Sequence, residues 1–484
     1  MSSGCFIGID QGSSATKALL IGSTGAELFG TRRDLSPPFR QGPRVEQDAG
    51  EILRSVVDAL EECLRHARSA GITVLGAGLS CQRSSCLLWD GATGEPLSPV
   101  LSWRDTRGAG LIDSLAAQRD RVFRSTGLPL TPYYAASKFR WLRENVPAGR
   151  GRNAIFGTLS SYLVQRLVQA ERPSIDHTNA ARTQLMDIRT LAWDDGLLDL
   201  FGLSGIRLPG ITPTACDLGT IRTASGDAPL LACIGDQQAA MLGLGVTDEG
   251  DGGINYGTGG FLMVNTGAVL VPAAGLMASV HYSTDREQRY LLEGSVNAVG
   301  DALAWLGERF GLFRDTDEVD DICWKASTDV VAFLALNGTG SPHWESGISS
   351  SLHGLTADST AADIVRAAVE GIAFFMKDIV EAIRTAGTMP ASFIAAGGLS
   401  SLSYLVQVQA DLLGTDLVVS AEGEASARGA AFLAGIQRGA WSRGDIKAAA
   451  GDGERVEKRE NPGILRRYER WKALHRMTGM LDHT

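Results

Sequence analysis

Near the midpoint of the 484-residue chain an apolar run ends in a carboxylate: Leu230-Leu231-Ala232-Cys233-Ile234-Gly235-Asp236-Gln237-Gln238. The run is typical of a buried strand, and Gly235 allows the chain to turn directly after it. A carboxylate at the end of a buried strand is displayed at the mouth of a cleft, where it can accept a proton from a bound hydroxyl. Asp236 is therefore a candidate general base. The alternative is a turn residue that only closes the strand, because Gly and Asp are common in turns.

The composition is that of a soluble globular protein, with 44% hydrophobic and 21% charged residues. A domain of ~150 residues is usual, so the length predicts more than one unit, and we expect two large ones. The net charge of −10 argues against nucleic acid as the main partner, since a phosphate backbone requires a basic face. An acidic protein can still bind ATP where backbone N–H groups, a Lys and Mg²⁺ neutralise the phosphates.

The cysteine pattern and the N-terminus predict a cytoplasmic protein. The seven cysteines form no C-x-x-C pair, which indicates reduced thiols, and the first ten residues lack the features of a signal peptide. Residues 261–280 form a largely apolar window, but Asn265-Thr266-Gly267 is a turn signal and Pro272 interrupts a helix. We therefore expect two short buried strands joined by a hairpin turn there, and no membrane partner.

Two turns rich in Gly and hydroxyl groups are candidates for holding a nucleotide. Residues 5–9 and 17–21 flank the first turn, where backbone N–H groups could surround a phosphate, Asp10 could reach Mg²⁺ through water and Lys17 offers a cation. Residues 254–264 repeat this layout around Thr258 and Gly259. After an expected strand at 392–396, Gly397 and Gly398 would let the backbone approach an adenine ring. Plain structural hairpins and helix packing are the alternatives.

A cluster of Arg and aromatic residues suits a sugar or polyol. Arg83 offers several donors to hydroxyls, and the indole of Trp103 can pack on the C–H side of a sugar. Tyr133 lies in a loop containing two prolines and could close over a ligand. The alternative is a surface ion pair of Asp105 with Arg104 or Arg107, beside a core Trp. Hydrophobic periodicity predicts helices at 48–71, 137–145, 156–168, 361–386 and 401–413, with an irregular segment at 176–183.

The motifs together resemble those of the FGGY carbohydrate kinases, most closely the glycerol-kinase branch, from Phe6 to about Gly435. They are Gly8-x-Asp10-x-Gly12-Ser13, Gln82-Arg83 and residues 103–107, 235–240, 256–259 and 396–398. The resemblance implies an α/β, two-domain actin/hexokinase-like (ribonuclease H-like) ATPase fold with an inter-domain cleft. The domains would span residues 1–245 and 246–484.

The resemblance also implies a role for each matching residue. Asp236 would be the catalytic base and Asp10 the carboxylate on the Mg²⁺ side. The ATP site would be formed by Asp10, Ser13, Ser14, Lys17, Thr258, Gly259, Gly300, Gly397 and Gly398. The acceptor would be held by Arg83, Ser84, Trp103, Tyr133, Asp236, Gln237 and Phe261. The expected partner is a small polyol or sugar, with a homodimer left open as the assembly.

Three departures from the glycerol-kinase pattern bear on the substrate and on regulation. Glycerol kinases usually have Glu where this chain has Ser84, and loss of that carboxylate leaves room for a larger acceptor. The Asn expected near the adenine site is replaced around Leu402-Ser403, and a Gly-Gly-x-Arg loop is missing before Ala228-Pro229.

Other activities remain as alternatives to the polyol kinase. One is a ketopentose kinase of the same family, although the chain lacks the Met-His pair familiar in xylulose kinases. The second is a non-catalytic ATP-binding switch of the actin or Hsp70 type, which would need neither Asp236 nor a polyol pocket. Neither a P-loop motif nor a G-x-G-x-x-G motif after a strand occurs.

Overall fold

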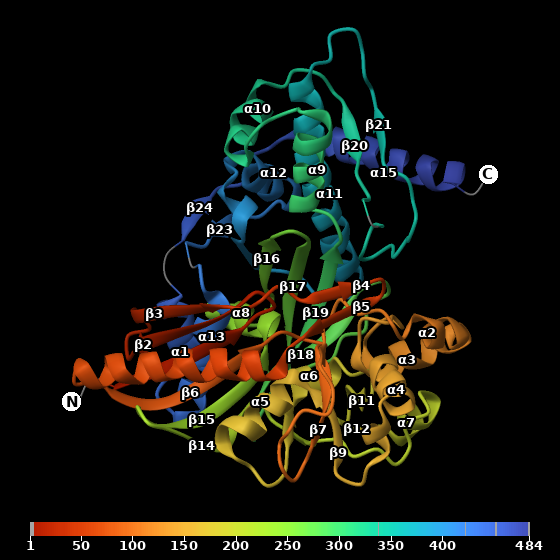
Figure 1. Cartoon of the computed structure of the whole chain (residues 1–484). Coiled ribbons are helices and arrows are strands. Elements are labelled where there is room, and N and C mark those ends of the chain that lie inside the picture. The colour runs from red at the N-terminus through yellow and green to blue at the C-terminus, as the bar shows by residue number, and fades with distance from the viewer. Residues whose placement is uncertain (1–3, 337, 422, 451–452, 483–484) are drawn as a thin grey trace.

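The apolar run before Asp236 forms strand β15 (Gly226–Gly235), one of six strands in the first of two large sheets (Figure 1). The computed structural model describes residues 4–336, 338–421, 423–450 and 453–482. The strand order of the first sheet is β14 (Ala215–Thr223), β15, β6 (Thr73–Cys81), β1 (Gly4–Gln11), β2 (Ala15–Gly22) and β3 (Glu27–Asp34). β1, β6 and β15 are parallel, and the other neighbours pair antiparallel.

The second large sheet repeats this arrangement. Its order is β18 (Met277–Ser283), β19 (Gln288–Val296), β17 (Gly260–Gly267), β16 (Asp251–Tyr256), β22 (Ser392–Ala396), β23 (Leu417–Val419) and β24 (Glu454–Val456). In both sheets a hairpin (β1–β2 or β16–β17) is extended on one side by an antiparallel strand, β3 or β19. On its other side it is extended by two parallel strands, β6 and β15 or β22 and β23. Each half therefore has the same core, and the α/β two-domain fold expected from the sequence is confirmed.

Smaller sheets complete the two halves. A five-stranded sheet has the order β4 (Phe39–Gln41), β5 (Arg44–Gln47), β8 (Val100–Leu101), β7 (Cys86–Asp90), β9 (Ala154–Thr158). Three strand pairs are β10 (Ser174–Asp176) with β13 (Gly210–Thr212), β11 (Met186–Asp187) with β12 (Ala192–Trp193), and β20 (Val331–Phe333) with β21 (Ser351–His353).

The helices of the first half are α1 (Ala49–Ser69), α2 (Ala109–Ser114), α3 (Arg119–Thr126), α4 (Ala135–Asn145), α5 (Leu159–Val168), α6 (His177–Ala181), α7 (Asp195–Leu200) and α8 (Asp236–Gly243). Those of the second half are α9 (Gly300–Phe310), α10 (Val319–Lys325), α11 (Ala361–Thr385), α12 (Ser403–Leu413), α13 (Ala425–Arg438), α14 (Arg443–Ala449) and α15 (Pro462–Asp482). One face of the first sheet packs on α1 and α5, and the other packs on α8 and α13.

Helix α13 returns from the second half of the chain to the first sheet. Figure 1 shows it in blue among the red and orange strands. Gly8 of β1 makes this approach possible, because a Cβ atom there would lie 1.8 Å from the carbonyl oxygen of Ala427. A domain boundary at residue 245 separates the strands of the two large sheets, but it assigns α13 to the half opposite the sheet on which this helix packs. The boundary stays a proposal.

Several sequence expectations for single elements need correction. Residues 156–168 are not one helix: β9 ends at Thr158 and α5 follows, because residues 154–158 pair with β7. The segment 176–183 is not irregular, since Asp176 caps α6 through the N–H groups of Thr178 and Asn179. The strands within 261–280, β17 and β18, do not form a hairpin, because both pair with β19, which lies between them.

Two helices begin at residues whose side chains cap them. α11 starts with the capping box of Thr360 and Asp363. α1 starts at Asp48, whose side chain accepts from the N–H of Glu51, but Glu51 itself accepts from Ser36 instead of completing a capping box. Within the described residues no helix has both the length and the apolar character needed to cross a membrane.

Candidate active site

The candidate site lies where three parallel strands of the first sheet end together. In the register, Asp10 of β1 lies opposite Ser80 of β6, and Gly235 of β15 lies opposite Cys81 of β6. The chain then continues from β6 to Arg83 and from β15 to Asp236, the first residue of α8. Because parallel strands place their carboxyl ends at one edge, this topology brings together two predicted carboxylates and the predicted acceptor-binding arginine.

Asp236 is held through only one of its carboxylate oxygens. The backbone N–H of Gln237 donates to Oδ1 over 2.8 Å, and Nε of Arg83 lies 3.3 Å from the same atom. Among the described residues, Oδ2 makes no hydrogen bond, and the side chain is 28% exposed. Burial raises the pKa of Asp236, against the opposing effects of Arg83 and the Gln237 N–H. Asp236 thus has a partly exposed carboxylate with increased proton affinity, as a general base requires.

Arg83 connects Asp236 to the second half of the chain. Its two terminal nitrogens donate to the two carboxylate oxygens of Glu293 in β19, each over 3.0 Å. Arg182, directly after α6, also pairs with Glu293, and it donates to Ser279 of β18 over 2.9 Å. Burial would raise the pKa of Glu293, but Arg182 and Arg83 lower it to about 2. Four buried or half-buried charges from both halves therefore form one chain ending at the candidate base.

Asp10 is a carboxylate whose surroundings favour binding of a cation. Its Oδ1 accepts from the Ser80 hydroxyl over 2.8 Å, and Lys17 lies opposite it in the ladder of β1 and β2. Burial and the charge of Asp236 raise the pKa of Asp10 to about 7. Lys17 itself pairs with Glu424, the residue before α13, over 2.7 Å. No group of three or more potential metal-binding side chains occurs among the residues that the structure describes.

The two Gly- and hydroxyl-rich turns both lie at sheet edges as predicted. Residues 12–14 join β1 to β2, and residues 257–259 join β16 to β17. At the second turn the N–H of Gly300 donates to the carbonyl of Gly257 over 3.0 Å, so α9 begins directly on the turn that carries Thr258 and Gly259. Gly397 has a φ of +94°, and a Cβ atom there would lie 2.4 Å from Oδ1 of Asn255 at the end of β16.

The residues of the second half that were predicted to bind the nucleotide therefore lie around the ends of β16 and β22. Gly398 follows Gly397 with open space where a side chain would stand. In the first half, the hydroxyl of Ser13 lies 3.4 Å from Nε1 of Trp103, and Ser14 is exposed at the tip of the turn. The first turn is thus in contact with the loop expected to hold the acceptor.

The remaining predicted acceptor residues differ in how they are placed. Ser84 is buried beside Arg83 with a φ of 65°, and Oε1 of Gln237 is buried with no partner among the described residues. Phe261 of β17 packs against the cluster that contains Met241 of α8. The side chain of Tyr133 is half exposed, and the carbonyl of Tyr133 accepts from Lys138 over 2.7 Å.

The Asp105 pair considered in the sequence is present, but it is buried. Arg107 pairs with Asp105 over 2.7 Å and with Glu46 over 2.6 Å, while Arg104 lies over the Trp103 ring, 4.8 Å from its centroid. Asp105 also accepts from the N–H of Val45 over 2.7 Å. This pair braces the loop that carries Trp103, so the structural interpretation of Asp105 and the functional interpretation of Trp103 are compatible.

Sequence reasoning missed three residues of this site: Thr178, Arg182 and Glu293. The hydroxyl of Thr178 accepts from the N–H of Gly235 over 2.8 Å and so fixes the peptide before Asp236. Thr178 and Arg182 belong to the polar segment 176–183, and its position in the chain gave no sign that it packs against Gly235. Glu293 follows two leucines in an apolar strand. A carboxylate within such a strand is a signal for a buried partner.

Comparison with protein families gives two adjacent matches that cover most of the chain. The model described as the FGGY family of carbohydrate kinases, N-terminal domain, matches residues 5–243, and the model of the C-terminal domain matches residues 252–438. A glycerol kinase from Thermus brockianus is 36% identical over 454 residues, which cover 91% of this chain and 92% of that protein. A glycerol kinase from Shewanella oneidensis is 33% identical over 448 residues, which cover 90% and 91%.

Solved structures show the same fold over the whole length. The crystal structure of Plasmodium falciparum glycerol kinase with ADP superposes with a TM-score of 0.93 at 28% identity, over 99% of this chain and 98% of that one. The xylulose kinase from Rhodospirillum rubrum superposes with a TM-score of 0.90 at 21% identity, over 99% of each chain. At that identity the second likeness speaks for the fold alone.

Proposed function

This chain belongs to the FGGY family of carbohydrate kinases, and we propose that it transfers the γ-phosphate of ATP to a hydroxyl of a small polyol with Asp236 as the general base. That it is an ATP-dependent sugar or polyol kinase follows from the family. The assignment of the base rests on one observation: Asp236 has a partly exposed side chain, hydrogen-bonded among the described residues through Oδ1 alone, at the edge shared with Asp10 and Arg83.

The acceptor site of this proposal is formed by Arg83, Ser84, Trp103, Tyr133, Asp236, Gln237 and Phe261. The buried Oε1 of Gln237 supports it, because a buried acceptor without a partner is costly unless a bound group donates to it. Trp103 supports it as well, since its indole N–H donates to Ser13 of the first turn and its backbone N–H donates to Ser85, so that its ring could pack on the C–H side of a polyol beside that turn.

The nucleotide site is formed by Ser13, Ser14, Lys17, Thr258, Gly259, Gly300, Gly397 and Gly398. Backbone N–H groups of the two turns would hold the phosphates, and Gly398 leaves space for a flat ring. Lys17 is paired with Glu424 through partly exposed atoms, and such pairs contribute only about 0–1 kcal/mol, so phosphate oxygens can replace Glu424 as its partner. The likeness to a glycerol kinase solved with ADP supports nucleotide binding by this fold.

Asp10 would hold Mg²⁺, through water, on the phosphates of ATP. The residues fit this ion, since a carboxylate whose pKa is raised to about 7 gains most from a nearby cation. The described residues offer no cluster of several ligand side chains, which matches the usual coordination of Mg²⁺ by few carboxylates together with water and phosphate oxygens. When bound, Mg²⁺ would neutralise charge on the transferring phosphate.

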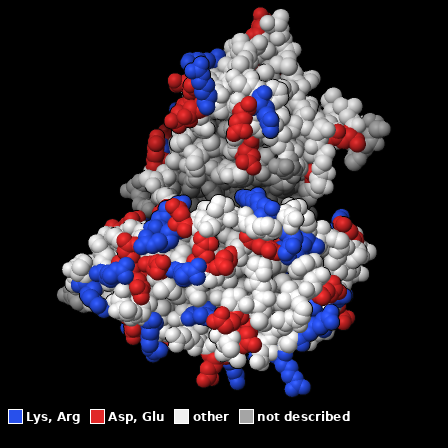
Figure 2. All heavy atoms as spheres, viewed as in Figure 1, with Lys and Arg blue, Asp and Glu red and all other residues white. Residues whose placement is uncertain are grey.

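The chain's own residues then perform three tasks. Asp236 accepts the hydroxyl proton at Oδ2 while Arg83 and Gln237 hold its Oδ1 in place. Lys17 and the turn N–H groups compensate phosphate charge. In this proposal the two halves together would exclude water from the site. Figure 2 shows an indented outline between the upper and lower parts of the molecule. Positioning and charge compensation are the main contributions a protein makes to phosphoryl transfer.

Two observations bear on the class of acceptor, and they favour acceptors of different size. Curated relatives at 33–36% identity are named glycerol kinases, which favours glycerol. Ser84 in place of the usual Glu removes a carboxylate acceptor and favours a polyol longer than glycerol. We therefore propose a polyol of three to five carbons, with a ketopentose as the alternative, and on sequence grounds a cytoplasmic enzyme that forms a monomer or homodimer.

One experiment tests the function directly. The purified chain is incubated with ATP, Mg²⁺ and one acceptor at a time from glycerol, erythritol, pentitols, ketopentoses and gluconate, and release of ADP is measured. We expect acceptor-dependent ADP release with at least one polyol, and release slower by ~10²- to 10⁴-fold in the Asp236→Asn variant. ADP release at the same rate with and without every acceptor would contradict the proposal and favour an ATP-binding switch.

A further inference from the structure

Lys138 is a fully buried lysine in α4 whose ammonium group donates to three main-chain carbonyls. Its Nζ donates to the carbonyl oxygens of Ser84 over 3.1 Å, Ser102 over 2.8 Å and Tyr133 over 2.7 Å. An ammonium group has three N–H donors, so all of them are used. Within the described residues no carboxylate lies at ion-pair distance from this nitrogen.

The three acceptors belong to three separate segments of the proposed acceptor site. Ser84 is itself a proposed acceptor-binding residue and has the left-handed backbone conformation with a φ of 65°. Ser102 is the residue before Trp103, and its segment follows β8. Tyr133 lies in the loop before α4. One side chain thus joins the main chains of the loops that carry Ser84, Trp103 and Tyr133.

The charged groups nearby do not give Lys138 another role. Cys86 of β7, Asp105 and Arg107 are the titratable or charged groups that face it. Asp105 is engaged by Arg107 and by the N–H of Val45, and burial raises the pKa of the Cys86 thiol to about 12. The three carbonyl dipoles therefore compensate the ammonium charge. These hydrogen bonds hold the three loops around the Nζ atom of Lys138.

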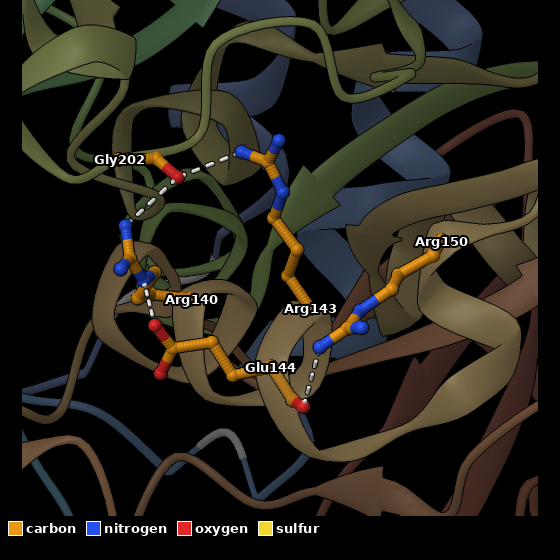
Figure 3. Close-up of a pocket in the computed structure, with 5 residues that line it drawn as sticks. All are labelled: Arg140, Arg143, Glu144, Arg150 and Gly202. Atoms are coloured by element: carbon orange, nitrogen blue, oxygen red, sulfur yellow. Dashed lines mark hydrogen bonds and ion pairs between the residues drawn. The ribbon is translucent and has the colours of Figure 1, made fainter.

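Helix α4 is fixed at its other end, so Lys138 projects from a rigid support. Figure 3 shows Arg140 and Arg143 converging on the carbonyl of Gly202, with distances of 3.1 and 2.7 Å. Arg140 also contacts Glu144 over 2.5 Å, and Arg150 donates to the Glu144 carbonyl over 3.4 Å. These side chains line a pocket of about 290 Å³. Their contacts are arginine hydrogen bonds to main-chain carbonyls near the C-terminus of α4, which stabilise that end of the helix.

We propose that Lys138 is a positioning residue that fixes the shape of the acceptor pocket by holding the Ser84, Trp103 and Tyr133 loops through their carbonyl groups. The inference rests on the proposed function and adds a residue that touches neither acceptor nor nucleotide. It separates acceptor binding from ATP binding, since none of the three carbonyls belongs to the phosphate turns. It also implies that the pocket loses selectivity when the ammonium group is lost.

The test is a comparison of acceptor and ATP kinetics in three variants. In Lys138→Met, which keeps the length but removes the donors, we expect the acceptor KM to rise about 10- to 100-fold, because small displacements of binding groups have effects of this size. The KM for ATP should stay within about twofold of the wild-type value. Lys138→Arg, which restores donors and charge, should recover part of the acceptor affinity. Lys325→Met at an exposed position is the control.

A second measurement uses the unmodified enzyme and holds even where Lys138→Met fails to fold. Burial lowers the pKa of Lys138 to about 8. A neutral amine has only two donors, so the acceptor KM should rise from about pH 7 to about pH 9 while the ATP KM does not. Thermal shifts induced by acceptor and by ATP should separate in the same way.

The outcomes distinguish this inference from the proposed function. An acceptor KM that stays constant with pH and in a folded Lys138→Met variant overturns the inference and leaves the kinase intact. A parallel rise of both KM values also overturns it, because that result describes a purely structural lysine. Absence of phosphorylation of every acceptor by the unmodified chain overturns the proposed function and this inference with it.

Discussion

Nε of Arg83 lies 3.3 Å from Oδ1 of Asp236, so the proposed acceptor-binding arginine and the proposed base form an ion pair across the ends of two neighbouring strands. The pair fixes the direction of the carboxylate and leaves Oδ2 for the acceptor hydroxyl. It also connects the base to the second half of the chain, because the same guanidinium binds Glu293. The arrangement of the two lobes and the orientation of the base are thus mechanically linked.

Replacing the base tests the central assignment. Asp236→Asn keeps the shape of the side chain and an acceptor for the Gln237 N–H but cannot take a proton, so we expect kcat to fall by ~10²- to 10⁴-fold. ATP binding, measured by calorimetry, should change little. The exposed Asp58→Asn in α1 is a matched control. A kcat close to that of the wild type in a folded Asp236→Asn variant would remove Asp236 from the mechanism.

The raised pKa of Asp10 predicts a pH-dependent requirement for Mg²⁺. Burial and Asp236 raise this pKa to about 7, so below that pH the carboxyl group is protonated and cannot attract a cation. The Mg²⁺ concentration needed for half-maximal ATP binding should rise up to about tenfold per pH unit below about pH 7.

Two variants check the source of this effect. Asp10→Asn should lose the pH dependence, and Asp236→Asn should move it to lower pH, because a charge that raises the pKa of Asp10 is gone. Calorimetric titrations of the unmodified chain at pH values on both sides of the transition provide the measurement. Equal Mg²⁺ midpoints across that range would exclude Asp10 from the metal site.

Ser84 is expected to set the size of the acceptor. Ser84→Glu adds a carboxylate for hydroxyl groups and fills space, so kcat/KM for glycerol should rise relative to that for a pentitol by about tenfold, the effect of one charged hydrogen bond. Ser84→Gln, similar in size but neutral, should exclude the pentitol without gaining glycerol. The φ of 65° strains any of these side chains equally. An unchanged ratio of acceptor activities in the Glu variant would show that another residue selects the substrate.

Sequence patterns sufficed for the features of the site that are local. The strand before Asp236 and the turns around Ser13 and Thr258 follow from apolar runs interrupted by Gly, because period and turn chemistry are encoded within ten residues. Short apolar runs were ambiguous: residues 154–158 became β9 because β7 was available to pair with them. No local pattern distinguishes that strand from the start of a helix.

Contacts between distant parts of the chain could not be predicted. Glu293 lies 210 residues after Arg83, and the carbonyls held by Lys138 come from three segments that only the fold brings together. Gly8 is a sequence feature related to the packing of α13 on the first sheet. A glycine in a buried strand indicates that another segment approaches closely, but it does not identify that segment.

The buried pair of arginines around Glu293 predicts a stability effect with a defined pH dependence. Glu293→Gln would leave Arg83 and Arg182 without their shared counter-charge, and removing one partner of a buried ion pair costs about 3–5 kcal/mol. The folded-state pKa of Glu293, about 2, lies below its usual value of 4.5, so its contribution is present above about pH 4.5 and is lost as the pH falls towards 2. Urea unfolding at several pH values should therefore show that the free energy of unfolding of the wild type declines over this window and that that of the variant declines less.

The control is Glu61→Gln, at a partly exposed pair with Arg65, which should change the free energy of unfolding by only about 0.5 kcal/mol. If Glu293→Gln matched the wild type in both stability and acid dependence, the charge chain would not hold Arg83 against the base, and the link between lobe arrangement and catalysis would have to lie elsewhere.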